Sequence, residues 1–79
     1  IVIEIEFNGK PSALSTTEAH YWVFDDGEKY MWITPGTLRQ IIEPLRPVKF
    51  VGNGDNKSKL AYLVKKDIII SNCLKVDKY

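Results

Sequence analysis

The chain has 79 residues, of which 44% are hydrophobic and 27% are charged. This length fits a single domain and excludes a second one, and the composition is that of an ordinary globular protein. No apolar run approaches the roughly 20 residues that a membrane-spanning helix needs. We therefore expect residues 1–79 to form one domain without a membrane segment.

The chain contains a single cysteine, Cys73, and so cannot form an internal disulfide bond. A domain whose stability does not depend on disulfides suits a reducing compartment, and a cytoplasmic location is expected. The N-terminal Ile-Val-Ile-Glu-Ile-Glu segment also lacks the basic region and the continuous apolar region of a signal peptide.

Charge is distributed unevenly along the chain, although the formal net charge is only +1. Residues 1–45 carry three basic and seven acidic side chains, a net charge of −4, whereas residues 46–79 carry eight basic and three acidic ones, a net charge of +5. The late lysines either form a face for an anionic partner or are solvated charges that keep a small domain soluble.

The first seven residues alternate between an apolar face and a mostly acidic one, which also includes Val2. Isoleucine or phenylalanine occupies every odd position, from Ile1 to Phe7, and glutamate occupies positions 4 and 6. This period of two predicts a strand with one apolar face, which Asn8-Gly9 ends with a turn signal. Residues 13–19 have no usable period and are expected to form a loop that includes at most one helical turn.

Two aromatic-rich runs, Tyr21–Phe24 and Tyr30–Ile33, are separated by an Asp-Asp-Gly-Glu segment. Asp-Gly between two β-prone runs is a strong hairpin signal, so we expect an antiparallel hairpin here. Alternation places Trp22 with Phe24 on one face and Tyr21 on the other, so aromatic side chains occupy both faces. Such a hairpin is either covered on both sides or offers its outer face to a partner.

A short amphipathic helix is predicted directly after the hairpin. Large apolar residues recur from Leu38 onward at the spacing i, i+3, i+4, i+7, which forms one helix face. Either Thr34 or Thr37 can cap the N-terminus, and Pro44 limits the far end. The helix is expected to span about Thr37–Glu43.

The rest of the chain indicates further strands. Residues 48–51, 60–64 and 68–71 are apolar and β-prone, residues 52–56 are the most turn-prone segment, and residues 74–76 alternate as a last strand. The predicted order is therefore roughly β-β-β-α-β-β-β. We expect an α+β fold in which one short helix packs on a small, predominantly antiparallel sheet.

The inventory for catalysis is small, and we expect a non-enzymatic protein without cofactor or metal. His20 is the only histidine, so no histidine triad or multi-histidine metal site can form. Cys73 is best interpreted as a small buried hydrophobe. Asp25 and Asp26 are expected to be solvated turn residues rather than a catalytic carboxylate pair.

Several short motifs follow one another in a fixed order. They are Asp-Gly-Glu-Lys-Tyr at 26–30, Thr-Leu at 37–38, Phe50, Tyr-Leu-Val at 62–64 and Asp-Ile at 67–68. This order resembles the LytTR family, the mostly β DNA-binding domain of many bacterial response regulators. Family members usually carry His-Arg-Ser before Tyr-Leu-Val, where this chain has Lys-Leu-Ala. If this chain contacts DNA as the family does, the resemblance implies that Lys57 and Lys59 make the contacts in place of that motif, helped by Lys65 and Lys66.

Two functions from different classes are compatible with these observations. The first is a small nucleic-acid-binding module, with a role in transcription regulation, whose lysines contact the phosphates of DNA or of another anionic partner. Its contact residues would be Lys49, Lys57, Lys59, Lys65 and Lys66. The alternative is a protein-interaction or self-association module that uses exposed strand edges and the aromatic hairpin. Its contact residues would be Tyr21, Trp22, Tyr30 and Trp32.

Overall fold

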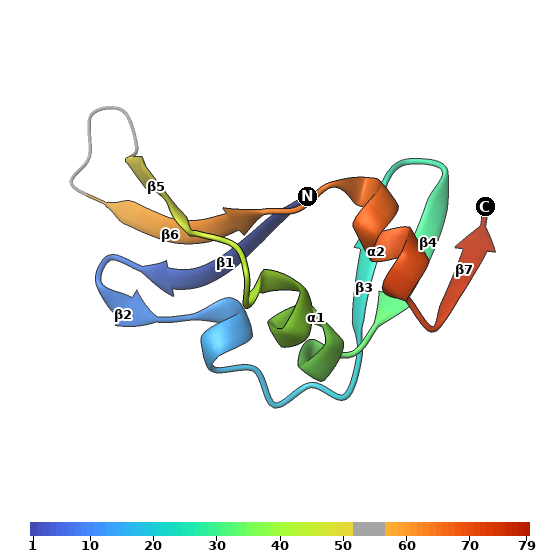
Figure 1. Ribbon diagram of the computed structural model, residues 1–79, viewed down its shortest axis with the longest axis horizontal. Coiled ribbons are helices and arrows are strands. Elements are labelled where there is room, and N and C mark those ends of the chain that lie inside the picture. Colours follow the sequence, from blue (N-terminus) through green and yellow to red (C-terminus); the bar gives the residue numbers. More distant parts are fainter. Residues whose placement is uncertain (52–56) are drawn as a thin grey trace.

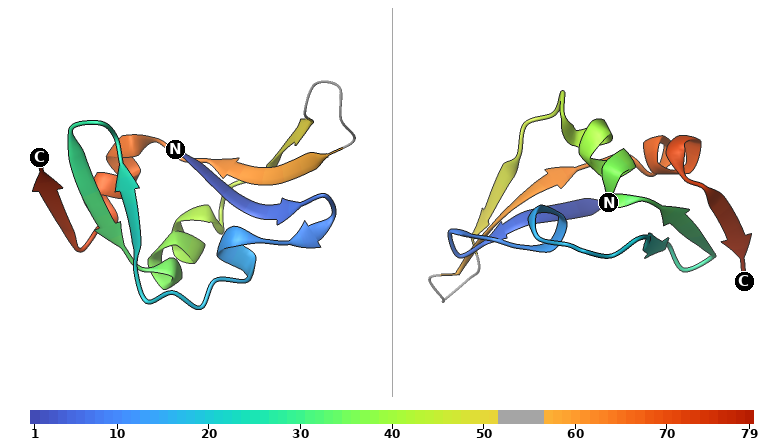
Figure 2. Two further views of the ribbon diagram at one scale, coloured as in Figure 1. Left: turned by 180° about the vertical axis from the view of Figure 1, so that it is seen from behind. Right: turned by 90° about the horizontal axis from the view of Figure 1, so that it is seen from below.

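The computed structural model describes residues 1–51 and 57–79, which form two antiparallel sheets and two short α-helices. Figure 1 shows the sheets at opposite ends of the long axis of the molecule. Both helices lie on the same side of the strands, as Figure 2 (right) shows. The expected α+β class is confirmed, but one sheet and one helix were predicted where the described chain has two of each.

The first sheet has the strand order β2-β1-β6-β5 with antiparallel neighbours throughout. Its strands are β1 (Val2–Phe7), β2 (Lys10–Pro11), β5 (Val48–Val51) and β6 (Ser58–Leu63). The predicted first strand is thus confirmed. A single 3-10 turn, η1 (Ala13–Ser15), follows β2 within the segment expected to be a loop.

A β-bulge in β1 changes the faces that its side chains occupy. Glu4 pairs with Ala61, but Glu6 pairs with Leu60, so Ile5 is an extra residue in the ladder. Beyond the bulge Phe7 pairs with Lys59 and lies on the same face as Glu4, opposite to Ile3. Strict alternation was therefore a wrong guide for Phe7, which is 36% exposed.

The second sheet contains the predicted hairpin. Its order is β3-β4-β7, with strands β3 (Trp22–Asp25), β4 (Lys29–Ile33) and β7 (Lys75–Lys78). Both pairings are antiparallel. The hairpin and the last strand are confirmed, and β7 completes the sheet by pairing with β4.

Asp26 organises the turn between β3 and β4. Its Oδ1 accepts hydrogen bonds from the backbone N–H groups of Glu28 and Lys29, both at 2.9 Å. Its Oδ2 accepts from the ammonium of Lys29 at 2.9 Å and from that of Lys66 at 3.2 Å. Gly27 beside it has a φ of +89°, in the left-handed region that glycine adopts readily. The Asp26 side chain is only 11% exposed, so the expectation of a solvated carboxylate was wrong.

The helix α1 (Pro35–Ile42) confirms the predicted amphipathic helix and begins two residues earlier than expected. Thr34 is its N-cap, and the Thr34 hydroxyl oxygen accepts a hydrogen bond from the backbone N–H of Thr37 at 3.2 Å. Pro35 occupies the first helical position, where its missing N–H has no intrahelical partner to lose. Leu38 points into the core and is fully buried.

A second helix, α2 (Lys66–Asn72), forms where the sequence predicted a strand. The three isoleucines in it favour strands by propensity, but tertiary packing decides the outcome. In the helix Ile69 is fully buried against β4 while Ile68 remains 39% exposed. Asp67 in the first turn complements the helix dipole. Neither helix in the described chain is long and apolar enough to cross a bilayer.

The hydrophobic core lies between the helices and the inner faces of both sheets. Its seven buried members come from six different segments of the described chain: Ile3, Leu14, Met31, Ile33, Leu38, Val64 and Ile69. Burial of one such side chain contributes about 1.5–3 kcal/mol. Because the core cluster of the described residues has only seven buried side chains, each of them contributes a large share of the stability.

Truncation of the two neighbouring isoleucines of α2 tests its orientation. Ile69→Ala is expected to lower the free energy of unfolding by about 2–5 kcal/mol, because it opens a cavity in the core. Ile68→Ala, at a half-exposed position of the same helix, should cost clearly less. Urea denaturation followed by circular dichroism measures both values, and equal losses would contradict this packing.

Asp26 also predicts a pH dependence of stability. The ammonium of Lys29, the two turn amides and the ammonium of Lys66 hold the pKa of Asp26 well below its usual range. Because the folded-state pKa is depressed, this stabilisation is complete above the unfolded pKa of about 3.9 and is lost as the pH falls further.

We therefore expect the thermal midpoint of the wild type to fall in acid. Asp26→Asn should lower the midpoint at neutral pH and make its acid dependence shallower. Glu43→Gln, which removes an exposed carboxylate just after α1, is the matched control. If both variants keep the acid dependence of the wild type, Asp26 does not have the stated role.

Candidate protein-interaction surface

The structure places the lysines of the predicted nucleic-acid interface in separate environments. Lys49 in β5 pairs with Leu60, while Lys59 in β6 pairs with Phe50. Because successive residues of a strand point to opposite faces, Lys49 and Lys59 lie on opposite faces of the first sheet. Lys57 directly precedes β6.

The other two lysines lie at the start of α2, which packs on the second sheet. Lys65 is the N-cap of α2, and the ammonium of Lys66 bonds the carboxylate of Asp26. Lys59 has a carboxylate neighbour of its own, Glu4, at 4.0 Å. The five lysines therefore do not form one face, and DNA binding stays a prediction from the sequence. The turn-prone residues 52–56 lie outside the described residues.

Three exposed tyrosine side chains are gathered on one face of the second sheet. This aromatic face is the side of β3-β4-β7 that points away from the core, and it extends to the residues that flank β3 and β7. It consists of Tyr21, Val23, Tyr30, Trp32, Leu74 and Tyr79. Three of the four residues predicted for a protein interface are thus brought together.

Trp22 is the exception among those four residues. It pairs with Ile33 on the inner face of the sheet and packs against the core. Its indole N–H donates to the hydroxyl oxygen of Thr17 at 3.1 Å, and its ring meets the edge of Phe24 with centroids 6.2 Å apart. Trp22 is therefore not part of the aromatic face.

Two exposed aromatic rings of the aromatic face contact each other. The rings of Tyr30 and Tyr79 are tilted by 42° with centroids 4.9 Å apart. The hydroxyl of Tyr79 donates a hydrogen bond to the carboxylate of Asp25. This bond raises the pKa of Tyr79, so the hydroxyl stays protonated as a donor.

Trp32 is held beneath a lysine on the same face. The Lys75 ammonium lies 5.0 Å from the centroid of the Trp32 ring and 3.2 Å from the carboxylate of Asp77. The indole Nε1 of Trp32 is buried and has no hydrogen-bond partner among the described residues. A shallow pocket of about 290 Å³ is lined by Trp32 and Lys75 together with Tyr21 and Leu74.

Charged residues cross the aromatic face in two rows. Asp25, Tyr30 and Asp77 are cross-strand neighbours in one row, and Val23, Trp32 and Lys75 are neighbours in the next. The face thus carries two carboxylates and one ammonium. Its charge is opposite in sign to the net charge of the chain.

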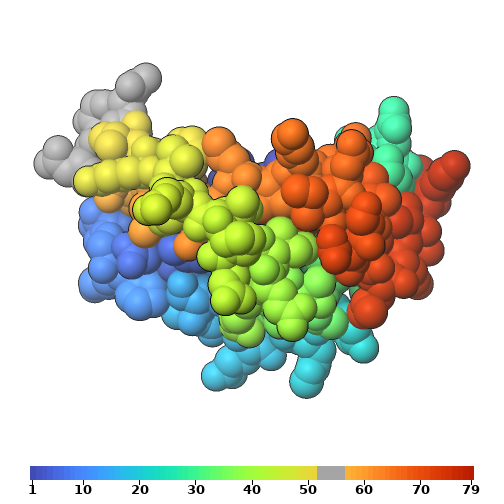
Figure 3. Space-filling model, viewed as in Figure 1, coloured from blue at the N-terminus to red at the C-terminus, as the bar shows by residue number. Residues whose placement is uncertain are grey.

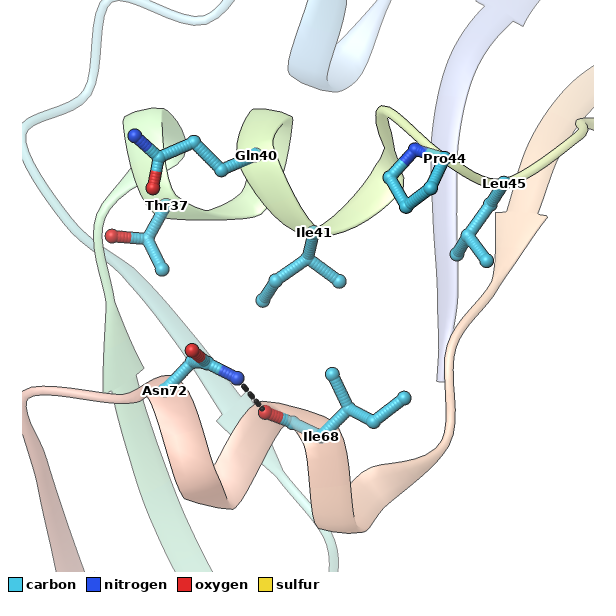
Figure 4. Close-up of a pocket in the computed structure, with 7 residues that line it drawn as sticks. All are labelled: Thr37, Gln40, Ile41, Pro44, Leu45, Ile68 and Asn72. Atoms are coloured by element: carbon cyan, nitrogen blue, oxygen red, sulfur yellow. Dashed lines mark hydrogen bonds between the residues drawn. The ribbon is translucent and has the colours of Figure 1, made fainter.

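A second hollow lies between the helices on the opposite side of the molecule. In Figure 3, α1 and α2 together form much of the face turned to the viewer. The groove between them has a volume of about 370 Å³ and is lined by Thr37, Gln40, Ile41, Pro44, Leu45, Ile68 and Asn72. Figure 4 shows that Ile41 and Ile68 point toward one another across it. The amide of Asn72 bonds the carbonyl of Ile68 at 2.8 Å.

The remaining candidates for chemistry lie apart from the aromatic face. His20 is exposed in the segment before β3. Cys73 is half-buried at the end of α2, where its thiol approaches the Ile70 carbonyl at 3.2 Å. Within residues 1–51 and 57–79, no three His, Cys, Asp or Glu side chains come together as metal ligands do.

Sequence reasoning missed the part of the aromatic face that β7 supplies. The alternation of residues 74–76 indicated a strand, but no local pattern says which strand it pairs with. The pairing with β4 is what brings Lys75, Asp77 and Tyr79 beside Tyr30 and Trp32.

The separation of the lysines predicts a shallow salt dependence for binding to duplex DNA. Each neutralised phosphate adds about −0.9 to the slope of log affinity against log salt, so one or two lysines give a slope of about −1 to −2. Fluorescence anisotropy of a labelled duplex at several salt concentrations measures this slope. A slope near −4.5, from about −0.9 at each of five lysines, would show that they act together and would support the nucleic-acid interface.

Comparison with known proteins finds no matching family model, no similar curated protein and no matching solved structure. The resemblance to the LytTR family therefore stays a prediction from short sequence motifs.

Proposed function

We propose that this protein is a non-enzymatic protein-interaction module that binds a basic segment of another protein on its aromatic face. The observation that carries the proposal is the exposure of Tyr30, Tyr79 and Tyr21, which are 41%, 66% and 55% exposed, beside the carboxylates of Asp25 and Asp77. Exposed aromatic clusters of this kind mark interaction sites, because they combine a large contact area with little side-chain entropy to lose.

The charges on the face favour a cationic ligand. Tyr30 lies between Asp25 and Asp77 in its cross-strand row, so an approaching phosphate would meet two carboxylates. A Lys or Arg side chain would instead be attracted both by the tyrosine ring and by the carboxylates. The aromatic face thus supports a protein partner better than a nucleic acid.

The molecule contains an internal example of this arrangement. The ammonium of Lys75 lies over the Trp32 ring and bonds Asp77. A basic side chain of a partner over Tyr30 or Tyr79, next to Asp25, would repeat the same combination of ring, cation and carboxylate. Exposed cation–π contacts are worth about 0.5–1 kcal/mol each, so several would be needed for useful affinity.

Titration with two peptides of equal length, one of lysine and glycine and one of glutamate and glycine, tests the proposal. Tryptophan fluorescence should report binding of the basic peptide, with affinity that falls as salt is added. Tyr30→Ser should weaken this binding about two- to fivefold, the equivalent of one exposed cation–π contact. Asp25→Lys should weaken it further.

Phe50→Ser is the control, because it removes an exposed aromatic ring from the other sheet. Its affinity for the basic peptide should equal that of the wild type. Preference for the acidic peptide, or equal losses in Tyr30→Ser and Phe50→Ser, would overturn the proposal.

A further inference from the structure

The outer face of the first sheet, which points away from the helices, is apolar and uncovered. It carries five large hydrophobic side chains that are between 36% and 57% exposed: Val2, Phe7, Val48, Phe50 and Leu63. Ladder pairing places them around Ala61, which is fully buried although it is not part of the core cluster. We refer to these six residues as the apolar face.

The apolar face owes its extent to the bulge in β1. Phe7, Lys59 and Phe50 are cross-strand neighbours in one row of this face. Without the extra residue at Ile5, Phe7 would point to the inner side and Glu6 would take its place. Both helices lie on the other side of the sheet (Figure 2, right), and the exposed fractions show that no described segment covers the face.

One acid and one base lie within the apolar face, and a second base, Lys10 of β2, pairs with Phe7 at its edge. The Lys59 ammonium is 4.0 Å from the Glu4 carboxylate, and its side chain remains 56% exposed. Glu4 also accepts a hydrogen bond from the Ser12 hydroxyl at 2.7 Å. A charge of each sign on one apolar surface makes that surface complementary to itself under a two-fold rotation.

We infer that the apolar face binds a second copy of this chain, sheet on sheet, with the Glu4–Lys59 pairs of the two copies facing each other. A two-fold axis through the region of Ala61 brings each Phe7-Lys59-Phe50 row toward the apolar side chains of the other copy. Two sheets packed in this way lie about 10 Å apart, with their strands within about 30° of each other. A different partner would need to supply the same two charges, whereas a second copy supplies them by symmetry.

The size of the face determines how tight this association can be. Three strands about 4.8 Å apart and about 20 Å long cover about 300 Å² in plan. Even allowing for the relief of the side chains, this is less than the roughly 800 Å² per partner of a standard interface. The dimer is therefore weak, and it forms at high protein concentration.

Sedimentation equilibrium over a range of concentrations tests the inference. The wild type should show a reversible monomer–dimer equilibrium, and Phe50→Asp should raise the dimer dissociation constant at least about tenfold. Val51→Asp is the matched control: it lies next in the same strand, is 67% exposed and points to the opposite face, so it should dimerise like the wild type. A wild type that stays monomeric, or equal losses in both variants, would overturn the inference.

A charge-swap experiment tests the same interface without relying on the fold of Phe50→Asp. Lys59→Glu leaves two acidic groups at the centre of the face and Glu4→Lys leaves two basic ones there, with Lys10 at the edge in both, so each variant alone should dimerise more weakly than the wild type. An equimolar mixture should form a heterodimer at least about tenfold tighter than either homodimer. No preference for the heterodimer would exclude this face as the interface. Basic-peptide binding on the aromatic face should be unchanged in Lys59→Glu, so the two proposals can fail separately.

Discussion

Two short helices and one 3-10 turn, η1, supply the cover that the described chain places over its two sheets. Since α1 and α2 lie on the same side of the strands, the core forms on that side only. No described segment covers the opposite side of each sheet, which explains why the aromatic face and the apolar face are exposed. A small domain has more surface relative to its volume than a large one, so a smaller fraction of its surface is buried.

The two exposed faces differ in chemistry, which argues against a single shared partner. The aromatic face is polar at its rim, with tyrosine hydroxyls and carboxylates beside the rings. The apolar face has aliphatic and phenylalanine side chains around one ion pair. The aromatic face suits a partner that binds and dissociates, and the apolar face suits the same face of a second copy of the chain. A module with both could present two copies of its binding face to one basic partner, which would increase the effective affinity.

Much of the fold followed from local signals in the sequence. The hairpin at residues 22–33 depends on a turn formed by neighbouring residues. The helix α1 depends on an N-cap residue and an apolar face that lie within one short segment. The helix α2 could not be predicted in this way, because Ile69 becomes a core residue only once β4 is present to bury it. Phe7 was misplaced for a similar reason, since a bulge is set by pairing with β6. The site was half predicted: Tyr21, Tyr30 and Trp32 share a face, but the β7 residues beside them come from a non-local pairing.

The isoleucine run of α2 also bears on how the chain avoids misfolding. In an unfolded chain, in which β4 has not formed, the run Ile68–Ile70 is a short β-prone apolar stretch that is exposed to other chains. Lys65, Lys66 and Asp67 precede it directly, and charges in that position oppose the pairing of such stretches between chains. Charges beside this run are thus useful to the unfolded chain as well as to the folded one, where Lys66 bonds Asp26. Two of the eight basic residues in the second half of the sequence, Lys65 and Lys66, therefore have a use in folding that needs no binding partner.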